Sequence, residues 1–165
     1  MYNQYLKVAP CNTGNGIFTT IHIPAKVPII EFRGEVCTAK QLPQDSSIYL
    51  QIGPDTFLSP TGTINGVDFI NHSCDPNCNM MVVGKRAILF SLYEIPAKSQ
   101  LTFDYSTTST DSLDDWQMTC LCGSPKCRKT ISGHQYLSKE QQQEYKAKGL
   151  FPIFITNPNL INKTW

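Results

Sequence analysis

The sequence lacks any marked excess of one charge and any long apolar run. Its 165 residues carry 14 basic and 13 acidic side chains, a net charge of +1, so no direct binding to nucleic acid is expected. No apolar run approaches the roughly 20 residues that a membrane helix needs. Residues 1–5 show neither the basic n-region nor the apolar h-region of a signal peptide. These absences predict an intracellular protein with no membrane partner, and they do not separate a nuclear from a cytoplasmic location.

The composition nevertheless supports a folded domain. Apolar residues make up 41% and aromatic residues 10% of the chain, which suffices for one packed core. Cysteine occurs seven times, an odd number. In an intracellular protein this count argues against a simple disulfide framework and favours metal ligands together with free thiols.

Short β-branched and apolar segments, separated by Gly, Pro and Asn, predict a mostly β chain of several small sheets with short helices. The expected strands are Tyr5–Val8, Gly16–Ile21, Ile29–Phe32, Ile48–Ile52, Met80–Val83, Ala87–Leu92 and Leu101–Phe103. No internal repeat is evident.

The C-terminal third of the sequence reads differently. Residues 106–115 are polar and are expected to form a linker or mobile loop. A helix is predicted from Ser138 to Lys148, because Ser138 and Gln141 form a capping-box pattern and Gly149 stands where a C′ glycine would. Its faces are nearly all polar, so it needs docking to be stable. The apolar tail at 150–165 is expected to pack on the body or on a partner.

Three cysteines at 120, 122 and 127 form a C-x-C-x4-C array. Zinc is held by four soft ligands in a tetrahedron, and thiolates at short spacing can wrap one ion through a tight turn. Gly123 and Pro125 supply such a turn. One ligand is still missing, and the remaining candidates are Cys11, Cys37, Cys74 and Cys78.

Four segments together point to a family. Residues 14–16 read GNG, 69–77 read FINHSCDPN, 101–105 read LTFDY, and the cysteine array follows. In this order and spacing they resemble the SET-domain protein-lysine methyltransferases, which transfer methyl groups from S-adenosylmethionine to lysine. The resemblance runs from about residue 6 to about residue 137. It implies a SET domain at 5–106, a post-SET zinc region at 116–132, and a C-terminal helix and tail at 133–165.

The resemblance also implies roles for individual residues. The SET fold threads the Asn-His-Ser-Cys and Phe-Asp-Tyr segments past each other in a pseudoknot-like arrangement. The implied contacts of S-adenosylmethionine are Gly14, Asn15, Gly16, Tyr49, Asn71, His72 and Leu121. The implied Zn²⁺ ligands are Cys74, Cys120, Cys122 and Cys127. A zinc ion shared in this way would draw the C-terminal segment over the active site.

Tyr105 and Phe103 are the expected catalytic residues. A lysine with a pKa near 10.4 is protonated at neutral pH and cannot attack, but an apolar channel and a nearby sulfonium both favour its deprotonation. Alignment then supplies much of the acceleration. Tyr105 is expected to orient the amine. In the family, a phenylalanine at the position of Phe103 leaves room for further methyl groups, which implies di- or trimethylation. The implied partner is a protein that presents a lysine, and a histone tail is plausible.

Three other interpretations compete with this one. A catalytically silent SET-like binding module would keep the fold and the zinc without turnover. A thiol hydrolase would use Cys74 as a nucleophile served by His72, since residues two apart on a strand share a face. A zinc-ribbon nucleic-acid binder is disfavoured by the neutral charge.

Overall fold

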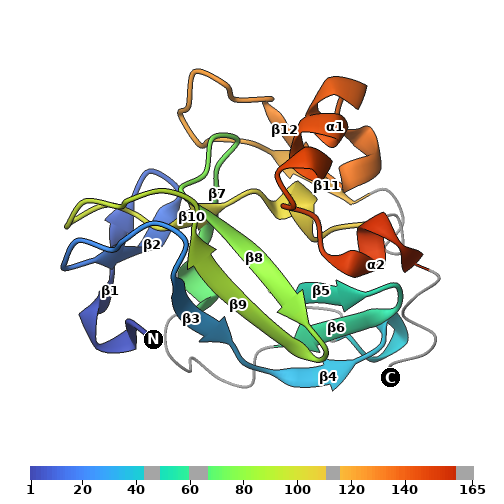
Figure 1. Ribbon diagram of the computed structural model, residues 1–165, viewed down its shortest axis with the longest axis horizontal. Coiled ribbons are helices and arrows are strands. Elements are labelled where there is room, and N and C mark those ends of the chain that lie inside the picture. The colour runs from blue at the N-terminus through green and yellow to red at the C-terminus, as the bar shows by residue number, and fades with distance from the viewer. Residues whose placement is uncertain (43–48, 60–66, 111–115, 159–165) are drawn as a thin grey trace.

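The computed structural model describes residues 1–42, 49–59, 67–110 and 116–158 (Figure 1). The strands in these ranges are β1 (Leu6–Cys11), β2 (Gly14–Thr19), β3 (Pro28–Phe32), β4 (Glu35–Cys37), β5 (Leu50–Gly53), β6 (Thr56–Ser59), β7 (Asn71–His72), β8 (Cys78–Val83), β9 (Arg86–Ser91), β10 (Thr102–Phe103), β11 (Gln117–Thr119) and β12 (Thr130–Ser132). The helices are α1 (Lys139–Ala147) and α2 (Ile153–Thr156), with 3-10 turns η1 (Asn3–Tyr5), η2 (Ala39–Gln41), η3 (Val67–Phe69), η4 (Tyr105–Thr107) and η6 (His134–Tyr136).

The strands form small separate sheets, as predicted. Two sheets have three strands, in the orders β3-β9-β8 and β4-β6-β5, and both are antiparallel. Three two-stranded sheets, β1-β2, β7-β10 and β11-β12, surround them. The mostly β fold class with a C-terminal helix is therefore confirmed.

Each of the seven expected strands overlaps an observed one, although residue 48 lies outside the described residues. The sequence reading missed five strands, β4, β6, β7, β11 and β12. They are two to four residues long, too short for an alternating pattern to be recognised. The expected linker is also partly wrong. Residues 106–108 are buried in and after η4, while 111–115 lie outside the described residues.

The main core fills the space between the two three-stranded sheets and β2. Its most buried members are aliphatic side chains from different elements, such as Ile29 of β3, Ile52 of β5, Leu89 of β9 and Leu101 before β10, each 0% exposed. Full burial of such a side chain contributes roughly 1.5–3 kcal/mol. Because β10 packs against this core, the core also fixes the position of the segment that follows, which begins with Asp104 and Tyr105.

A short repeat, which was not expected from the sequence, occurs in β2 and β9 and in the segments that follow them. Residues 17–27 and 89–99 are identical at five of eleven positions, and both contain Ile-Pro-Ala-Lys, at 23–26 and 95–98. The two copies face each other: Ile23 N–H donates to Ile95 O at 2.9 Å, and Ile95 N–H donates to Ile23 O at 2.8 Å. The lysines that end both tetrapeptides have left-handed φ angles of 60° and 67°. The expectation of no repeat is therefore wrong for this stretch.

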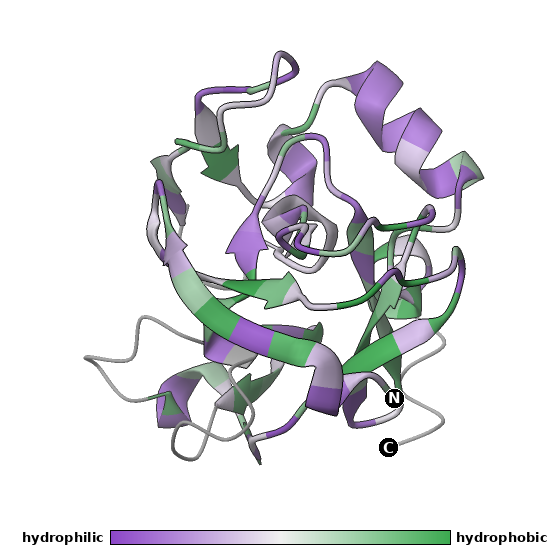
Figure 2. Cartoon of the chain, turned by 90° about the vertical axis from the view of Figure 1, so that its left-hand side faces the viewer, coloured by the Kyte–Doolittle hydropathy of each residue, from purple (hydrophilic) through white to green (hydrophobic). Residues whose placement is uncertain are grey.

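The predicted C-terminal helix is present as α1 and begins as the capping pattern predicts. Ser138 Oγ accepts from Gln141 N–H at 3.2 Å. At the other end Gly149 has φ +64°, and the amides of Gly149 and Leu150 donate to Lys146 O and Tyr145 O. This pair of bonds is a Schellman motif. It directs the chain back toward the sheet, and the helix itself is mostly hydrophilic (Figure 2).

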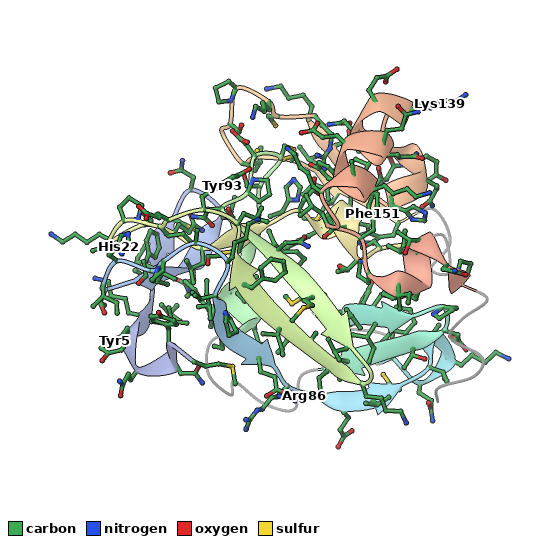
Figure 3. The ribbon with its side chains drawn as sticks, in the orientation of Figure 1. Tyr5, His22, Arg86, Tyr93, Lys139 and Phe151 are labelled. Atoms are coloured by element: carbon green, nitrogen blue, oxygen red, sulfur yellow. The ribbon has the colours of Figure 1, made fainter. Side chains whose placement is uncertain are left out.

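The docking surface of α1 is a small second core. It consists of Leu92, Leu137, Tyr145 and Leu150, with Phe90 and Phe151 packed against them. Phe151 lies in the segment between α1 and α2 (Figure 3). The expectation that the tail packs on the body is confirmed as far as Phe154, which is 3% exposed; residues 156–158 are exposed, and residues 159–165 lie outside the described residues.

Candidate functional site

The site is built where β7 and β10 run side by side. These two-residue strands pair in parallel, with Asn71 opposite Thr102 and His72 opposite Phe103. Ser73 N–H donates to Phe103 O at 3.1 Å, which continues the contact beyond the strands. The Asn-His-Ser-Cys and Phe-Asp-Tyr segments, far apart in the sequence, therefore lie next to each other, as the resemblance implied.

The glycine loop, residues 14–16, lies next to this pair of strands. Asn71 Nδ2 donates to Asn15 O at 2.8 Å, so the amide that was expected to contact the cofactor is fixed to the glycine loop. A Cβ on Gly16 would lie 2.3 Å from Gln100 Nε2 and 3.2 Å from Asn71 Nδ2. Gln100 was not singled out from the sequence. Its backbone bridge to Phe18 brings it here, and no local sequence signal could have shown this contact.

Replacement of Gly16 by alanine is expected to weaken binding of S-adenosylmethionine about tenfold, because the new methyl group displaces the two amide side chains on which the loop rests. Gln100 is flexible at its far end, so the melting temperature should change little. Calorimetric titration and thermal unfolding measure the two effects. In Gly84→Ala, at the β8–β9 turn with φ +56°, the reverse is expected: lower stability by about 1–2 kcal/mol and unchanged affinity. Equal affinities in Gly16→Ala and wild type would contradict the loop assignment.

Two other residues, Tyr49 and Leu121, were expected to contact the cofactor. The Tyr49 ring packs edge-on against Phe57, with centroids 5.8 Å apart. Leu121 is 65% exposed between two of the cysteines. Both remain predictions.

The two expected catalytic rings are in contact. The centroids of Phe103 and Tyr105 are 4.9 Å apart, and Phe103 is 6% exposed. The Tyr105 hydroxyl donates to Ile70 O at 2.7 Å. Burial raises the pKa of Tyr105 to about 12, so the hydroxyl keeps its proton at neutral pH. Tyr105 is thus positioned to accept a hydrogen bond rather than to remove a proton.

The side chain of His72 is buried, and both of its ring nitrogens have partners within the protein. Its Nδ1 accepts from Tyr105 N–H at 3.2 Å, and its Nε2 lies 3.2 Å from Cys74 Sγ. Nδ1 also lies 3.4 Å from Asp104 Oδ1, but burial lowers the pKa of His72 to about 4, so the ring is neutral and this contact is not an ion pair. Because Nδ1 accepts, Nε2 carries the proton and donates to the sulfur. This tautomer cannot deprotonate Cys74, which removes the basis for the thiol hydrolase.

The cysteine cluster brings together the ligand set that the resemblance implied. The sulfur atoms of Cys74, Cys120, Cys122 and Cys127 all lie within 4.8 Å of one another. The sulfurs of Cys74 and Cys120 are 3.7 Å apart, close to the roughly 3.8 Å edge of a tetrahedron with Zn–S bonds of about 2.3 Å. Backbone N–H groups of Arg128 and Lys129 point at two of the sulfurs, each at 3.4 Å. Such donors stabilise thiolates, so the cluster is suited to a zinc ion.

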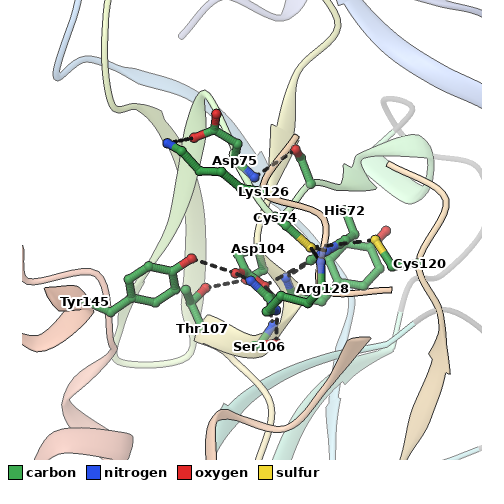
Figure 4. A network of polar contacts seen from close by, with 12 residues as sticks. His72, Cys74, Asp75, Asp104, Ser106, Thr107, Cys120, Lys126, Arg128 and Tyr145 are labelled. Carbon is green, nitrogen blue, oxygen red and sulfur yellow. Dashed lines mark hydrogen bonds and ion pairs between the residues drawn. The ribbon is translucent and has the colours of Figure 1, made fainter. Parts of the chain in front are cut away.

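A buried carboxylate, Asp104, connects the two catalytic candidates to the cysteine cluster. It was not identified from the sequence. Asp104 is 0% exposed and lies between the two catalytic candidates. Arg128 Nη1 and Nη2 donate to its two oxygens, both at 2.7 Å, and Tyr145 Oη and Ser106 N–H donate at 2.9 and 3.0 Å (Figure 4). An acidic residue directly after an apolar strand, followed later by an arginine next to a candidate metal ligand, is the signal that could have suggested this pair.

Comparison with known proteins agrees with this geometry. The family model described as "SET domain" matches residues 14–106, more than half of the chain. The chain belongs to the SET-domain family. The resemblance drawn from the motifs is thereby confirmed.

Individual relatives of this SET-domain chain are histone-directed. It is 33% identical over 131 residues to "Histone-lysine N-methyltransferase set1" of Dictyostelium discoideum, covering 71% of this chain and 8% of that protein. It is 30% identical over 127 residues to "Histone-lysine N-methyltransferase, H3 lysine-4 specific" of Saccharomyces cerevisiae, covering 68% of this chain and 12% of that one. The chain thus corresponds to a small part of these relatives.

Among solved structures, the SET-domain chain resembles KRYPTONITE in complex with mCHH DNA, an H3(1-15) peptide and SAH. The TM-score is 0.65 at 28% identity, covering 76% of this chain and 29% of that one. In the described part of the chain, no helix is long and apolar enough to cross a membrane.

Proposed function

We propose that the protein is an S-adenosylmethionine-dependent protein-lysine N-methyltransferase. The observation that carries this proposal is the convergence on the β7–β10 pair: the glycine loop is bound to Asn71, the Tyr105 hydroxyl is fixed by Ile70 O, and the cysteine cluster begins at Cys74. The names of the relatives, and the SAH and H3 peptide bound in the similar structure, support the same activity.

Residues of the glycine loop, together with the Asn71 amide and the His72 backbone, would hold S-adenosylmethionine. When bound, this cofactor supplies a methyl group on a positively charged sulfur. The loop glycines leave backbone groups free to approach such a ligand. The four thiolates would hold zinc, which fixes residues 120–127 to Cys74 and so keeps the C-terminal segment beside the site.

Tyr105 would orient the incoming amine. Its own proton is donated to Ile70 O, so the hydroxyl oxygen has lone pairs available for an N–H of a neutral lysine. The buried ring of Phe103 and the partly buried ring of Tyr105 offer an apolar surface that disfavours the ammonium form. The amine lone pair is then left to face the methyl group, and this alignment supplies the catalysis without a dedicated general base.

The proposed substrate is a protein that presents a lysine, and histone H3 is the first candidate because the relatives and the similar structure involve it. A histone substrate would place the enzyme in the nucleus.

The proposal is tested by incubating the zinc-loaded protein with methyl-labelled S-adenosylmethionine and core histones, beside a whole-cell protein extract. Intact-mass spectrometry then reads the products. Lysine methylation is the expected result. Cofactor binding without transfer to any protein in the extract would indicate a narrow substrate outside the extract, and neither binding nor transfer would indicate the catalytically silent module.

Phe103→Tyr is expected to shift the products from di- and trimethyl-lysine to monomethyl-lysine. The added hydroxyl beside Tyr105 can hold a water molecule where a second methyl group must fit. Product masses at long reaction times measure the change, with total turnover of the first methyl as the control. Monomethyl-lysine as the final product of the wild type would contradict the role of Phe103.

A further inference from the structure

The C-terminal helix contains one side chain with an unusual destination. Tyr145 is the only buried residue of α1, and its hydroxyl crosses to Asp104 Oδ2 at 2.9 Å rather than to solvent or to its own segment (Figure 4). The ring alone would satisfy the apolar contacts with Leu137, Leu150 and Phe151. The hydroxyl therefore contributes something other than packing: it is a donor to a buried carboxylate outside the C-terminal segment.

That carboxylate controls where η4 begins. Asp104 Oδ1 accepts from Ser106 N–H at 3.0 Å and thereby caps η4, whose first residue is Tyr105. A side-chain cap fixes the direction in which the chain enters a helical turn. The orientation of the Asp104 carboxylate is thus coupled to the backbone of the proposed amine-orienting residue.

The same carboxylate is tied to the cysteine cluster. Arg128 makes two parallel hydrogen bonds to it, with side-chain exposures of 15% for Arg128 and 0% for Asp104. Arg128 directly follows the last cysteine of the array, and its backbone N–H donates to Cys74 Sγ. A buried charge must have all its partners in place. If the hydrogen bond from Tyr145 is lost, the Asp104 carboxylate is free to reorient toward Arg128.

We infer that Tyr145 is a positioning residue for methyl transfer: its hydroxyl fixes the Asp104 carboxylate, and α1 thereby sets the alignment of Tyr105 and of the cysteine loop. This inference rests on the proposed function for its kinetic consequence. Its structural consequence, a linkage between α1 and the four thiolates, does not depend on that function.

The docking of α1 explains how Tyr145 is kept in place opposite Asp104. Asn79 Nδ2, on β8, donates to Leu150 O at 2.8 Å. The Schellman bond from Leu150 N–H to Tyr145 O then connects this anchor to Tyr145 itself. The helix end that carries Tyr145 is therefore fixed to the central sheet independently of the hydroxyl, and removal of the hydroxyl should leave α1 docked.

The test compares Tyr145→Phe with Phe151→Leu. The first variant keeps the ring and removes the donor. The second loosens the packing beside the same ring, which it contacts at a centroid distance of 5.8 Å, and keeps the donor. Each is measured for kcat and KM, for thermal unfolding, and, with Co²⁺ in place of zinc, for the absorption bands of the thiolate-bound metal.

Tyr145→Phe is expected to lower kcat about tenfold, to leave KM for S-adenosylmethionine within about twofold, to melt near the wild type and to shift the cobalt bands. Phe151→Leu is expected to melt lower, with wild-type kcat and bands at temperatures well below melting. Wild-type kcat and bands in Tyr145→Phe would overturn the inference. So would losses in both variants that follow their melting temperatures. If the wild type transfers no methyl group, the proposed function fails and the bands alone decide: a shift supports the link, and no shift overturns it.

Discussion

Tyr105→Phe is expected to reduce kcat for lysine methylation by about 100- to 1000-fold while cofactor affinity stays within about twofold, since loss of one oriented polar group at a reacting centre has effects of this size. The change removes one oxygen atom. That oxygen is 2.7 Å from Ile70 O in the free protein, and it is the group proposed to orient the amine. Single-turnover methylation, with calorimetric titration of S-adenosylmethionine, measures both quantities.

Tyr93→Phe is the matched control. Tyr93 is 59% exposed (Figure 3), so loss of its hydroxyl should leave kcat, affinity and stability unchanged. An unaltered kcat in Tyr105→Phe would remove Tyr105 from the mechanism. A parallel loss of cofactor binding would show that the residue organises the binding site instead of the amine.

Removal of zinc is expected to abolish methylation, by at least about 100-fold, and also to destabilise the fold. Four sulfurs within 4.8 Å of one another join Cys74, beside β7, to residues 120–127, and without a metal they have no covalent or ionic link. Metal binding by such a site is part of the folding free energy. A loss of about 3 kcal/mol corresponds to roughly 6–12 °C in melting temperature for a chain of this size. Activity, metal content and thermal unfolding are measured before and after chelation, and after zinc is restored.

Cys122→Ser and Cys37→Ser distinguish an effect of losing the metal site from an effect of losing any thiol. Cys122 belongs to the cluster and Cys37 does not; the Cys37 thiol donates to Phe57 O at 3.8 Å. The first variant should behave like the chelated protein, and the second like the wild type. Full activity in metal-free protein would show that the cluster is not needed to hold the site together.

Much of the site could be predicted because its residues occur in compact motifs. The C-x-C-x4-C array requires no tertiary information, since Gly123 can form the turn that brings its own neighbours together. The start and end of α1 were likewise local, because Ser138 and Gly149 act on backbone groups within a few residues. The longer strands were found because their apolar content is spread over enough residues to form a pattern.

Other features have no local cause. Strands β7 and β10 have two residues each and exist because Asn71 and His72 pair with residues about thirty positions later. Gln100 reaches the glycine loop through an isolated backbone bridge to Phe18. Residues 106–108 have the polar composition of a linker, yet they are buried, and the Arg128 guanidinium, 22 positions later, donates to Ser106 Oγ at 3.1 Å. In each case a partner far away in the sequence outweighs the residue's own preference.

The sequence by itself determined the family and the mostly β class, and it supplied most of the candidate site residues but not Gln100, Asp104 or Tyr145, because motifs of residue types at fixed spacing carry this information. The tertiary structure alone decided which of them act together. It placed the Asn71 amide on Asn15 and Gln100 beside Gly16, and it gave the Asp104 carboxylate donors from Arg128 and Tyr145. The physical reason is that a buried charge takes whichever partners the packing brings to it, and that packing is a property of the whole chain.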